Sequence, residues 1–188
     1  FPTRRSSDLA EQLKDDPSVE AILYIGASGH PEEKLARDNG LDFIGLNVSG
    51  MPRSLSPRLI TWPLQMWSAI ERAKEVLRQF RPTVVLGTGG YASAPPLAAA
   101  NALGVPTAVH EPDAHPGLVN RLLSRRAQLV SLGMQGAAAR INAPRGRIVF
   151  NGNPVRKSFL AERHRDSGCA ILGLRSDLKT VLVTGGSQ

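Results

Sequence analysis

The chain has 188 residues, 41% of them hydrophobic, and a formal net charge of +7. This length allows one sizeable domain and the start of a second, with the composition of a globular protein. The single cysteine, Cys169, excludes an internal disulfide. The positive charge favours anionic partners, but no zinc-ligand spacing, helix-turn-helix or RNA-binding pattern accompanies it, so nucleic acid is not expected.

The two ends of the chain look unlike the rest. The opening FPTRRSSDL has no long apolar core and no cleavage pattern, so it does not predict a signal peptide. Residues 1–7 resemble a non-native scar, and we leave them out of the predicted fold. The chain stops at VTGGSQ, where a strand should turn into a helix. We therefore expect a fragment.

Short apolar runs alternate with helical patterns along the chain, and a proline-rich loop is expected at 49–63. This alternation predicts an α/β fold with parallel strands and right-handed crossovers. Strands are predicted at 19–26, 42–48, 84–87, 107–109, 128–133, 147–152 and 178–186, and helices at 31–40, 66–80, 95–103 and 116–127.

The longest uncharged run, from Pro82 to Val109, has the length of a membrane helix. It is interrupted by Gly89-Gly90, by Pro95-Pro96 and by Gly104-Val105-Pro106. Strands that helices cover on both faces also read as continuous apolar runs. The run therefore predicts the core of an α/β unit.

Doubly wound sheets bind ligands beyond the carboxyl ends of their strands, and several polar or glycine-rich stretches lie there. Gly89 and Gly90 follow the predicted strand 84–87, and indicate either a phosphate-binding turn or a plain strand-to-helix turn. TGGSQ at the chain end has the same pattern. Arg156, after the strand 147–152, is either a phosphate partner or a surface charge.

A second polar stretch, HEPDAHPGLVNR, follows the strand 107–109 and carries His110, Glu111, Asp113 and His115. Carboxylates and imidazoles after a strand are typical of acid–base chemistry. Their spacing fits no common metal-ligand pattern, so a metal site is the less favoured alternative. A third interpretation is that Asp113 and His115 only shape the turn.

Four stretches occur in a specific order: GTGGYASAP, HEPDAHPGLVNR, GNPVR and TGGSQ. This combination resembles the MurG-type N-acetylglucosaminyltransferases, from about Val19 to Gln188. The resemblance implies a GT-B fold, in which two Rossmann-like domains face each other across a cleft. The expected domains are an acceptor-binding domain at 8–160, a linker at 161–168 and the start of a donor-binding domain at 169–188.

The resemblance also implies an activity. An inverting transferase of this type moves N-acetylglucosamine from UDP-GlcNAc to lipid I, undecaprenyl-pyrophosphoryl-MurNAc-pentapeptide, and so makes lipid II for peptidoglycan. A base would remove the proton from the acceptor 4-hydroxyl during direct displacement. We expect no cofactor and no metal, and a peripheral location on the cytoplasmic face of the plasma membrane.

The family's site residues transfer to matching positions of this chain. On the acceptor side, Glu111 is either the base or a positioning group. The other acceptor-side matches are Gly89, Gly90, Tyr91 and Asn120, and the donor-side matches are Asp113, Arg156, Gly185, Gly186, Ser187 and Gln188.

Two departures from the family pattern matter. The family usually reads His-Glu-Gln-Asn where this chain has His110-Glu111-Pro112-Asp113. An aspartate cannot donate a hydrogen bond as the amide does, and its charge would repel a UDP diphosphate. The family's first glycine-rich loop, with its histidine, has no counterpart here. We therefore expect this chain to be inactive by itself.

An anionic membrane surface is a further expected partner. Trp62, Leu64, Met66 and Trp67 stand in sequence near Arg58, Arg72, Lys74, Arg78 and Arg81, a combination that suits a lipid interface. The alternative is that the apolar stripe from Met66 to Phe80 faces the core. We expect that for most of the stripe, with Trp62 and Trp67 exposed.

Two other functions remain open from the sequence. One is a related GT-B glycosyltransferase acting on another lipid, such as a diacylglycerol. The other is a non-catalytic module that binds a lipid pyrophosphate or a membrane, which the departure at Asp113 keeps open.

Overall fold

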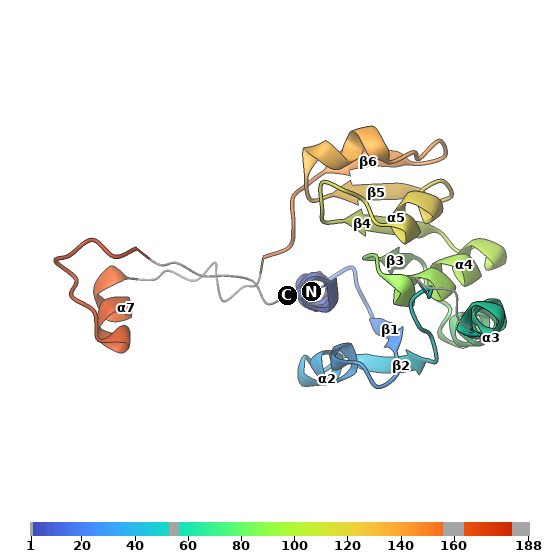
Figure 1. Ribbon diagram of the computed structural model, residues 1–188, viewed down its shortest axis with the longest axis horizontal. Helices are drawn as coiled ribbons and strands as arrows, with labels where there is room; N and C mark the ends of the chain where they lie inside the picture. The colour runs from blue at the N-terminus through green and yellow to red at the C-terminus, as the bar shows by residue number, and fades with distance from the viewer. Residues whose placement is uncertain (1, 53–56, 156–163, 182–188) are drawn as a thin grey trace. The chain divides into compact units, whose positions relative to one another are not determined.

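The computed structural model describes residues 2–52, 57–155 and 164–181. The chain divides into two compact units, Phe1–Pro154 and Val155–Gln188 (Figure 1). The first unit holds both parallel sheets. Within its described part, the second unit contains one helix, α7 (Arg165–Leu172).

The first unit alternates strands and helices, as predicted. Its strands are β1 (Leu23–Ala27), β2 (Asp42–Leu46), β3 (Val85–Gly87), β4 (Thr107–Glu111), β5 (Leu129–Leu132) and β6 (Arg147–Phe150). Its α-helices are α1 (Pro2–Lys14), α2 (Pro31–Asp38), α3 (Arg58–Phe80), α4 (Ala94–Leu103) and α5 (Leu118–Leu123), with 3₁₀ turns η1 (Tyr91–Ser93) and η2 (Gln135–Arg140).

All described strand pairs are parallel, which confirms the predicted α/β class. One sheet has the order β1-β2 and the other the order β3-β4-β5-β6. In the larger sheet, Gly87 pairs with Val109 and Glu111 pairs with Leu132. The carboxyl ends of β3, β4 and β5 therefore lie along one edge, and the loops that follow them start there.

Small side chains let the helices approach the sheets and each other closely. Ala69 and Ala73 of α3 and Ala99 and Ala100 of α4 are all buried in one apolar cluster. A second cluster lies around Leu97, Val109, Val130 and Leu132 on the larger sheet. The part of the uncharged run in these two clusters is core, as predicted, whereas Val84 and Leu86 are exposed. Within residues 2–52, 57–155 and 164–181, no helix is long and apolar enough to cross a membrane.

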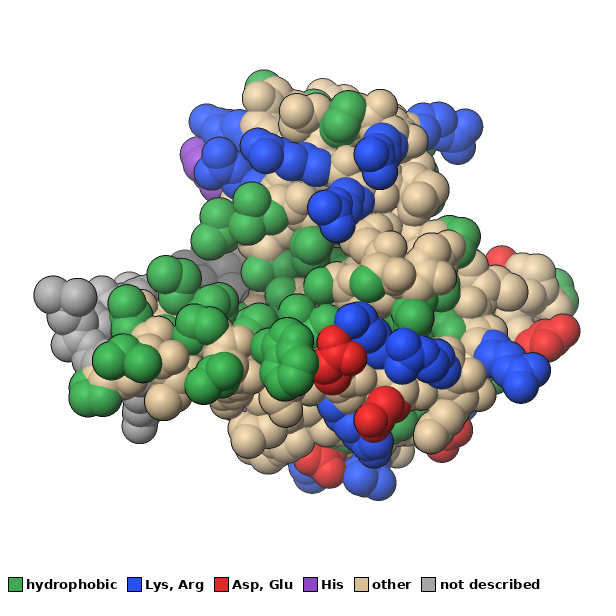
Figure 2. Space-filling view, turned by 90° about the vertical axis from the view of Figure 1, so that its right-hand side faces the viewer, with side chains coloured by type: hydrophobic (Ala, Val, Ile, Leu, Met, Phe, Trp, Pro, Cys, Tyr) green, Lys and Arg blue, Asp and Glu red, His purple; other side chains and the backbone are tan. Residues whose placement is uncertain are grey.

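Helix α3 is longer than the sequence predicts. It begins at Arg58, so the second part of the expected loop 49–63 is helical. Pro63 lies inside the helix and lacks the N–H that would bond back to the carbonyl of Leu59. This part of the helix is exposed, so water can hydrate that carbonyl. The face of the molecule in Figure 2 shows hydrophobic side chains gathered beside Lys and Arg side chains.

Two other helices differ from the expectation. Helix α1 includes residues that we excluded as a scar, and its Ala10 packs with Ala36 and Leu41. Helix α7 starts at Arg165, inside the expected linker 161–168. Most of the strand expected at 178–186 lies outside the described residues, and residues 178–181 are not in a strand.

The approach of β6 to β5 depends on Gly146. A Cβ at this position would overlap the backbone carbonyl oxygen of Ala127, and Arg147 N donates to Gln128 O at 3.0 Å. We predict that Gly146→Ala lowers the free energy of unfolding by about 2 to 3 kcal/mol, because backbone cannot move aside as a side chain can. Urea denaturation measures this change.

The matched control is Gly136→Ala. A Cβ there would meet the Ala114 Cβ at 3.5 Å, an ordinary contact. Its free energy of unfolding should change by less than about 0.5 kcal/mol. Equal effects of the two substitutions would contradict the tight approach at Gly146.

Candidate functional site

The candidate site forms where β3 and β4 end. The glycine turn at 88–90 follows β3, and the loop 112–117 follows β4 and leads into α5. Gly89 has a φ of 89°, and a Cβ on it would lie 3.0 Å from Asn120 Nδ2. Glycine is therefore required at this position both by the backbone conformation and by the close approach of α5. The structure thus brings together Gly89 and Asn120, which are 31 positions apart in the sequence.

Glu111 organises the second of these loops. Its Oε1 accepts a hydrogen bond from Asp113 N at 2.9 Å. Its Oε2 accepts from Gly117 N at 3.2 Å and from Asn120 Nδ2 at 2.9 Å. The residue is only 2% exposed. A buried carboxylate is tolerated only with such donors, so these three bonds fix the loop around the charge.

Asn120 connects this carboxylate to the glycine turn. Its Nδ2 donates to His110 O at 3.2 Å as well as to Glu111. Its Oδ1 is buried and accepts no hydrogen bond from the described residues. Asn120 therefore belongs to the same buried cluster as Glu111.

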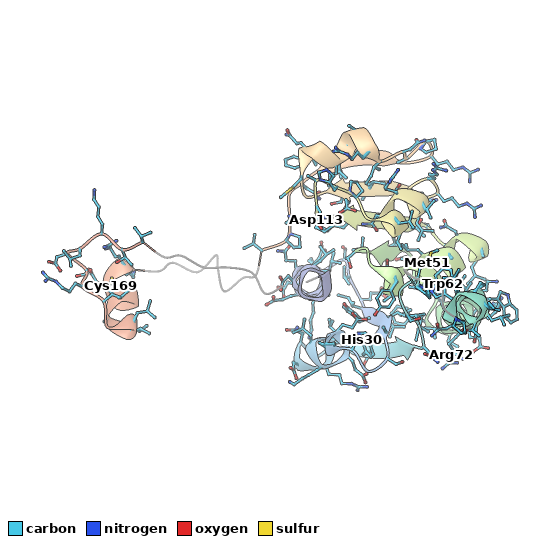
Figure 3. All side chains as sticks on the ribbon, viewed as in Figure 1. His30, Met51, Trp62, Arg72, Asp113 and Cys169 are labelled. Atoms are coloured by element: carbon cyan, nitrogen blue, oxygen red, sulfur yellow. The ribbon has the colours of Figure 1, made fainter. Side chains whose placement is uncertain are left out.

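The two histidines of the loop have different surroundings. His110 is 3% exposed, and its Nδ1 lies 2.9 Å from Ser131 Oγ, which donates to Asn151 Oδ1 at 2.6 Å. This chain of polar groups runs from β4 across β5 to the residue after β6. His115 is exposed, and so is Asp113, which is labelled in Figure 3.

The segment after β6 also reaches this loop. Asn153 Nδ2 donates to Pro112 O at 3.2 Å. A Cβ on Gly133 would overlap the Asn153 side chain, so the glycine makes room for this contact. The GNPV part of the predicted GNPVR motif is thus joined to the HEPD part. Arg156, Gly185, Gly186, Ser187 and Gln188 lie outside the described residues, and their predicted roles stay predictions.

Tyr91, from the glycine turn, has a neighbour that the sequence analysis missed. Its hydroxyl lies 3.3 Å from His30 Nε2, and the two rings meet edge to face. Burial and the negative charge of Glu32 raise the pKa of Tyr91 above its ordinary value. His30 follows β1 (Figure 3). The rule that ligands bind beyond strand ends would have found it.

No group of three or more His, Cys, Asp or Glu side chains that could hold a metal ion occurs among the residues that the structure describes. The side chains near these strand ends include the carboxylate of Asp113, the carboxamide of Asn120, the phenol of Tyr91 and the imidazoles of His30 and His115.

Comparisons with known proteins identify the family to which the chain belongs. Residues 8–131 match the model of the glycosyltransferase family 28 N-terminal domain. The chain belongs to glycosyltransferase family 28.

Relatives in this family support the resemblance inferred from the motifs. A protein of Halothermothrix orenii is 39% identical over 168 residues, which are 89% of this chain and 45% of the relative. One of Bacteroides fragilis is 35% identical over 188 residues, 100% of this chain and 48% of the relative. Both are named UDP-N-acetylglucosamine–N-acetylmuramyl-(pentapeptide) pyrophosphoryl-undecaprenol N-acetylglucosamine transferase. The chain thus spans about half the length of these relatives.

Solved structures agree on the fold. MurG of Acinetobacter baumannii superposes with a TM-score of 0.65 at 24% identity, over 81% of this chain and 42% of that one. The S. aureus MnaA structure with UDP superposes with a TM-score of 0.62 at 16% identity, over 81% of this chain. The predicted GT-B-type fold class is confirmed for this family 28 domain.

The hydrogen bonds around Glu111 make a sharp prediction for this domain. Glu111→Gln keeps the shape of the side chain but sets an amide N–H against one of the three donors. A buried donor without an acceptor costs about 1 to 3 kcal/mol. We expect the free energy of unfolding, measured in urea, to fall by about that amount.

Glu20→Gln is the matched control, because Glu20 is exposed in the segment before β1. Its effect should stay within about 0.5 kcal/mol. If the two variants unfold at the same urea concentration, the Glu111 carboxylate does not hold the loop.

Proposed function

We propose that this chain is the acceptor-side domain of an inverting transferase. The enzyme would move N-acetylglucosamine from UDP-GlcNAc to undecaprenyl-pyrophosphoryl-MurNAc-pentapeptide and make lipid II for peptidoglycan. The observation that carries the proposal is the contact between Gly89 and Asn120. It joins the glycine turn to the Glu111 loop at one sheet edge, in a chain whose relatives are named for this reaction.

The glycine turn is suited to the acceptor diphosphate. Gly89 and Gly90 have positive φ angles of 89° and 76°, and no atom lies within 4 Å of a Cβ placed on Gly90. The turn leads through η1 into the N-terminus of α4. The N–H groups of the open glycine turn can bind phosphate oxygens. Pro95 and Pro96, at the start of α4, have no N–H to add.

Of the two roles predicted for Glu111, its contacts favour positioning. Both carboxylate oxygens accept hydrogen bonds from the loop, and the side chain is buried. A base must reach the acceptor hydroxyl within hydrogen-bond distance. We propose that Glu111 shapes the acceptor loop and that exposed Asp113 faces the donor side. The base would then come from another residue of the complete enzyme.

We further propose that α3 binds an anionic membrane surface. Ile60, Leu64 and Trp67 are 80%, 69% and 64% exposed. Their spacing places them on one stripe of the helix, while Ala69 and Ala73 face the core. An exposed apolar stripe of this kind is typical of an interaction surface.

Two parts of the sequence expectation for α3 need correction. Trp62 is half-buried, and its Nε1 donates to Ser49 O at 3.1 Å, so Trp67 alone of the two tryptophans is exposed. Arg72 and Lys74 form ion pairs with Glu75 and Glu71 of the same helix, at 2.8 and 2.7 Å. Their charge is largely neutralised, so the proposed membrane contact depends mainly on the apolar stripe.

The transfer reaction is tested in a chimera with the Halothermothrix orenii relative. The 168 aligned residues of the relative are replaced by the matching residues of this chain. We expect transfer of radiolabelled N-acetylglucosamine from UDP-GlcNAc to a lipid I analogue. Gly89→Ala should raise the KM for the analogue about tenfold, because the strained backbone and the contact with Asn120 cost about 1 to 2 kcal/mol.

Gly40→Ala is the control, since Gly40 also has a positive φ of 64° but lies after α2, outside the site. Its KM should be unchanged. A folded chimera that binds the analogue without transfer would favour the non-catalytic module and make Asp113→Asn the next variant. Transfer to diacylglycerol but not to lipid I would favour the related lipid glycosyltransferase.

The membrane proposal is tested by vesicle sedimentation. Leu64→Ser should weaken binding to phosphatidylglycerol vesicles about tenfold, since a buried leucine contributes about 1.5 to 3 kcal/mol. Ile171→Ser is the control, because Ile171 is 83% exposed but belongs to α7. In Trp62→Phe, Trp67 is the remaining tryptophan, and its fluorescence should shift to the blue on binding. Equal binding of both serine variants would contradict the proposal.

A further inference from the structure

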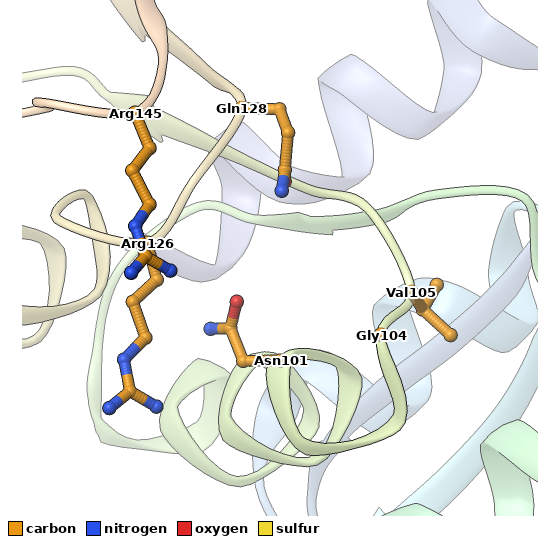
Figure 4. A pocket seen from close by; sticks show the side chains of 6 residues that line it. All are labelled: Asn101, Gly104, Val105, Arg126, Gln128 and Arg145. Atoms are coloured by element: carbon orange, nitrogen blue, oxygen red, sulfur yellow. The ribbon is translucent and has the colours of Figure 1, made fainter.

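A polar pocket lies at the edge of the larger sheet opposite to the candidate site. It encloses about 210 Å³ and is lined by Asn101, Gly104, Val105, Arg126, Gln128 and Arg145 (Figure 4). These residues stand where α4 ends and where β4, β5 and β6 begin. Thr107 and Glu111 are the two ends of β4, about 13 Å apart at 3.3 Å per residue. The pocket is therefore separate from the candidate site.

The amide groups in the pocket are oriented by Thr107. Gln128 Oε1 accepts from Thr107 N at 2.7 Å, so the oxygen of this side chain faces the backbone. Thr107 Oγ1 lies 3.5 Å from Asn101 Oδ1. Because both oxygens face Thr107, both NH₂ groups are left as donors. In Figure 4 the Asn101 nitrogen points to the side where the two arginines lie.

The two arginines, Arg126 and Arg145, are both exposed and add positive charge to the pocket. Arg126 comes from the turn after α5 and Arg145 from the turn before β6, and both extend to the same side of the pocket (Figure 4). Among the described residues, no carboxylate forms an ion pair with either one. From Ala114 to Val155 the sequence has no Asp or Glu, and it has the arginines 121, 125, 126, 140, 145 and 147.

We propose that this pocket binds one phosphate-class oxyanion, either a lipid phosphate headgroup or a soluble phosphate. Two guanidinium groups and two amide NH₂ groups match the oxygens of a phosphoryl group. A pocket of 210 Å³ is smaller than the usual site for a drug-sized ligand, and fits a small anion or a headgroup. Two like charges side by side also gain most from an anion placed between them.

A competing explanation concerns the end of α4. Helix C-termini carry partial negative charge, and Gly104, the C-cap of α4, lines the pocket. The arginines could serve only to neutralise that end. In that case their removal would lower the Tm by the same amount with and without phosphate. Anion binding predicts a loss of Tm that depends on phosphate.

The test titrates inorganic phosphate into the full chain at neutral pH, with chloride at equal ionic strength as the reference. Calorimetry gives the Kd, and thermal unfolding gives the rise in Tm. The double variant Arg126→Gln/Arg145→Gln should raise the Kd at least about tenfold and abolish the phosphate-dependent rise in Tm. Gln128→Glu should do the same, because it keeps the acceptor for Thr107 N and puts a negative charge in the pocket.

Arg125→Gln/Arg147→Gln is the matched control. It lowers the net charge by the same amount, from +7 to +5, using two exposed arginines that do not line the pocket. It should bind phosphate as the unmodified chain does. Equal weakening in both double variants, or a Tm loss that does not depend on phosphate, would overturn the proposal.

Vesicles distinguish the two sources of phosphate. Phosphatidic acid in phosphatidylcholine vesicles is compared with phosphatidylcholine alone. If the pocket variant loses vesicle binding beyond the loss in the control, the ligand is a headgroup. If only the affinity for inorganic phosphate falls, the ligand is soluble. If phosphate binds neither free nor on vesicles, the pocket is not an anion site.

Discussion

The buried carboxylate of Glu111 is the constraint on which the candidate site depends. A charge at 2% exposure is unfavourable unless donors surround it, and here the donors come from its own loop and from α5. The same bonds therefore set the path of residues 112–117 and the start of α5. Through Asn120 they also fix the distance to Gly89. One ionised group thus ties together the ends of two neighbouring strands.

This arrangement explains which parts of the site the sequence could predict. Parallel strands deliver their following loops to one edge, so the strand pattern predicts that the glycine turn and the Glu111 loop lie close together. Asn120 is assigned to the site by the family resemblance alone, and the roles of these residues stay predictions. The identity of the donors to Glu111 could not be predicted, since two of the three are backbone N–H groups. The position of His30 after β1 is a signal that the sequence does carry, but its contact with Tyr91, 61 residues away, leaves no local pattern.

The errors in the fold have similar causes. Three prolines favour a loop at 49–63, but α3 includes Pro63, and the residues around it, among them Leu59 and Leu64, are exposed to water. Trp62 was expected at the surface with Trp67, but its indole N–H bonds to Ser49 O, a tertiary contact. Helix α7 ends at Gly173 in the left-handed conformation. That glycine was a stop signal within reach of sequence analysis, but the polar segment before it was interpreted as a linker.

The distribution of charge separates the molecule into two parts. Four basic side chains of α2 and α3 pair with acids one turn away, in Lys34–Asp38, Arg37–Glu33, Arg72–Glu75 and Lys74–Glu71. Such exposed pairs contribute less than about 1 kcal/mol each, but they cancel the local field. The β5 and β6 region has arginines and no acids, so the net charge of +7 originates mainly there. Positive charge that is concentrated in one region of the chain favours the binding of an anion there over a general contribution to solubility. The larger sheet thus carries two separate charged regions. The arginines near the starts of β5 and β6 line the proposed anion pocket, and the buried Glu111 carboxylate at the end of β4 holds the loop of the candidate site.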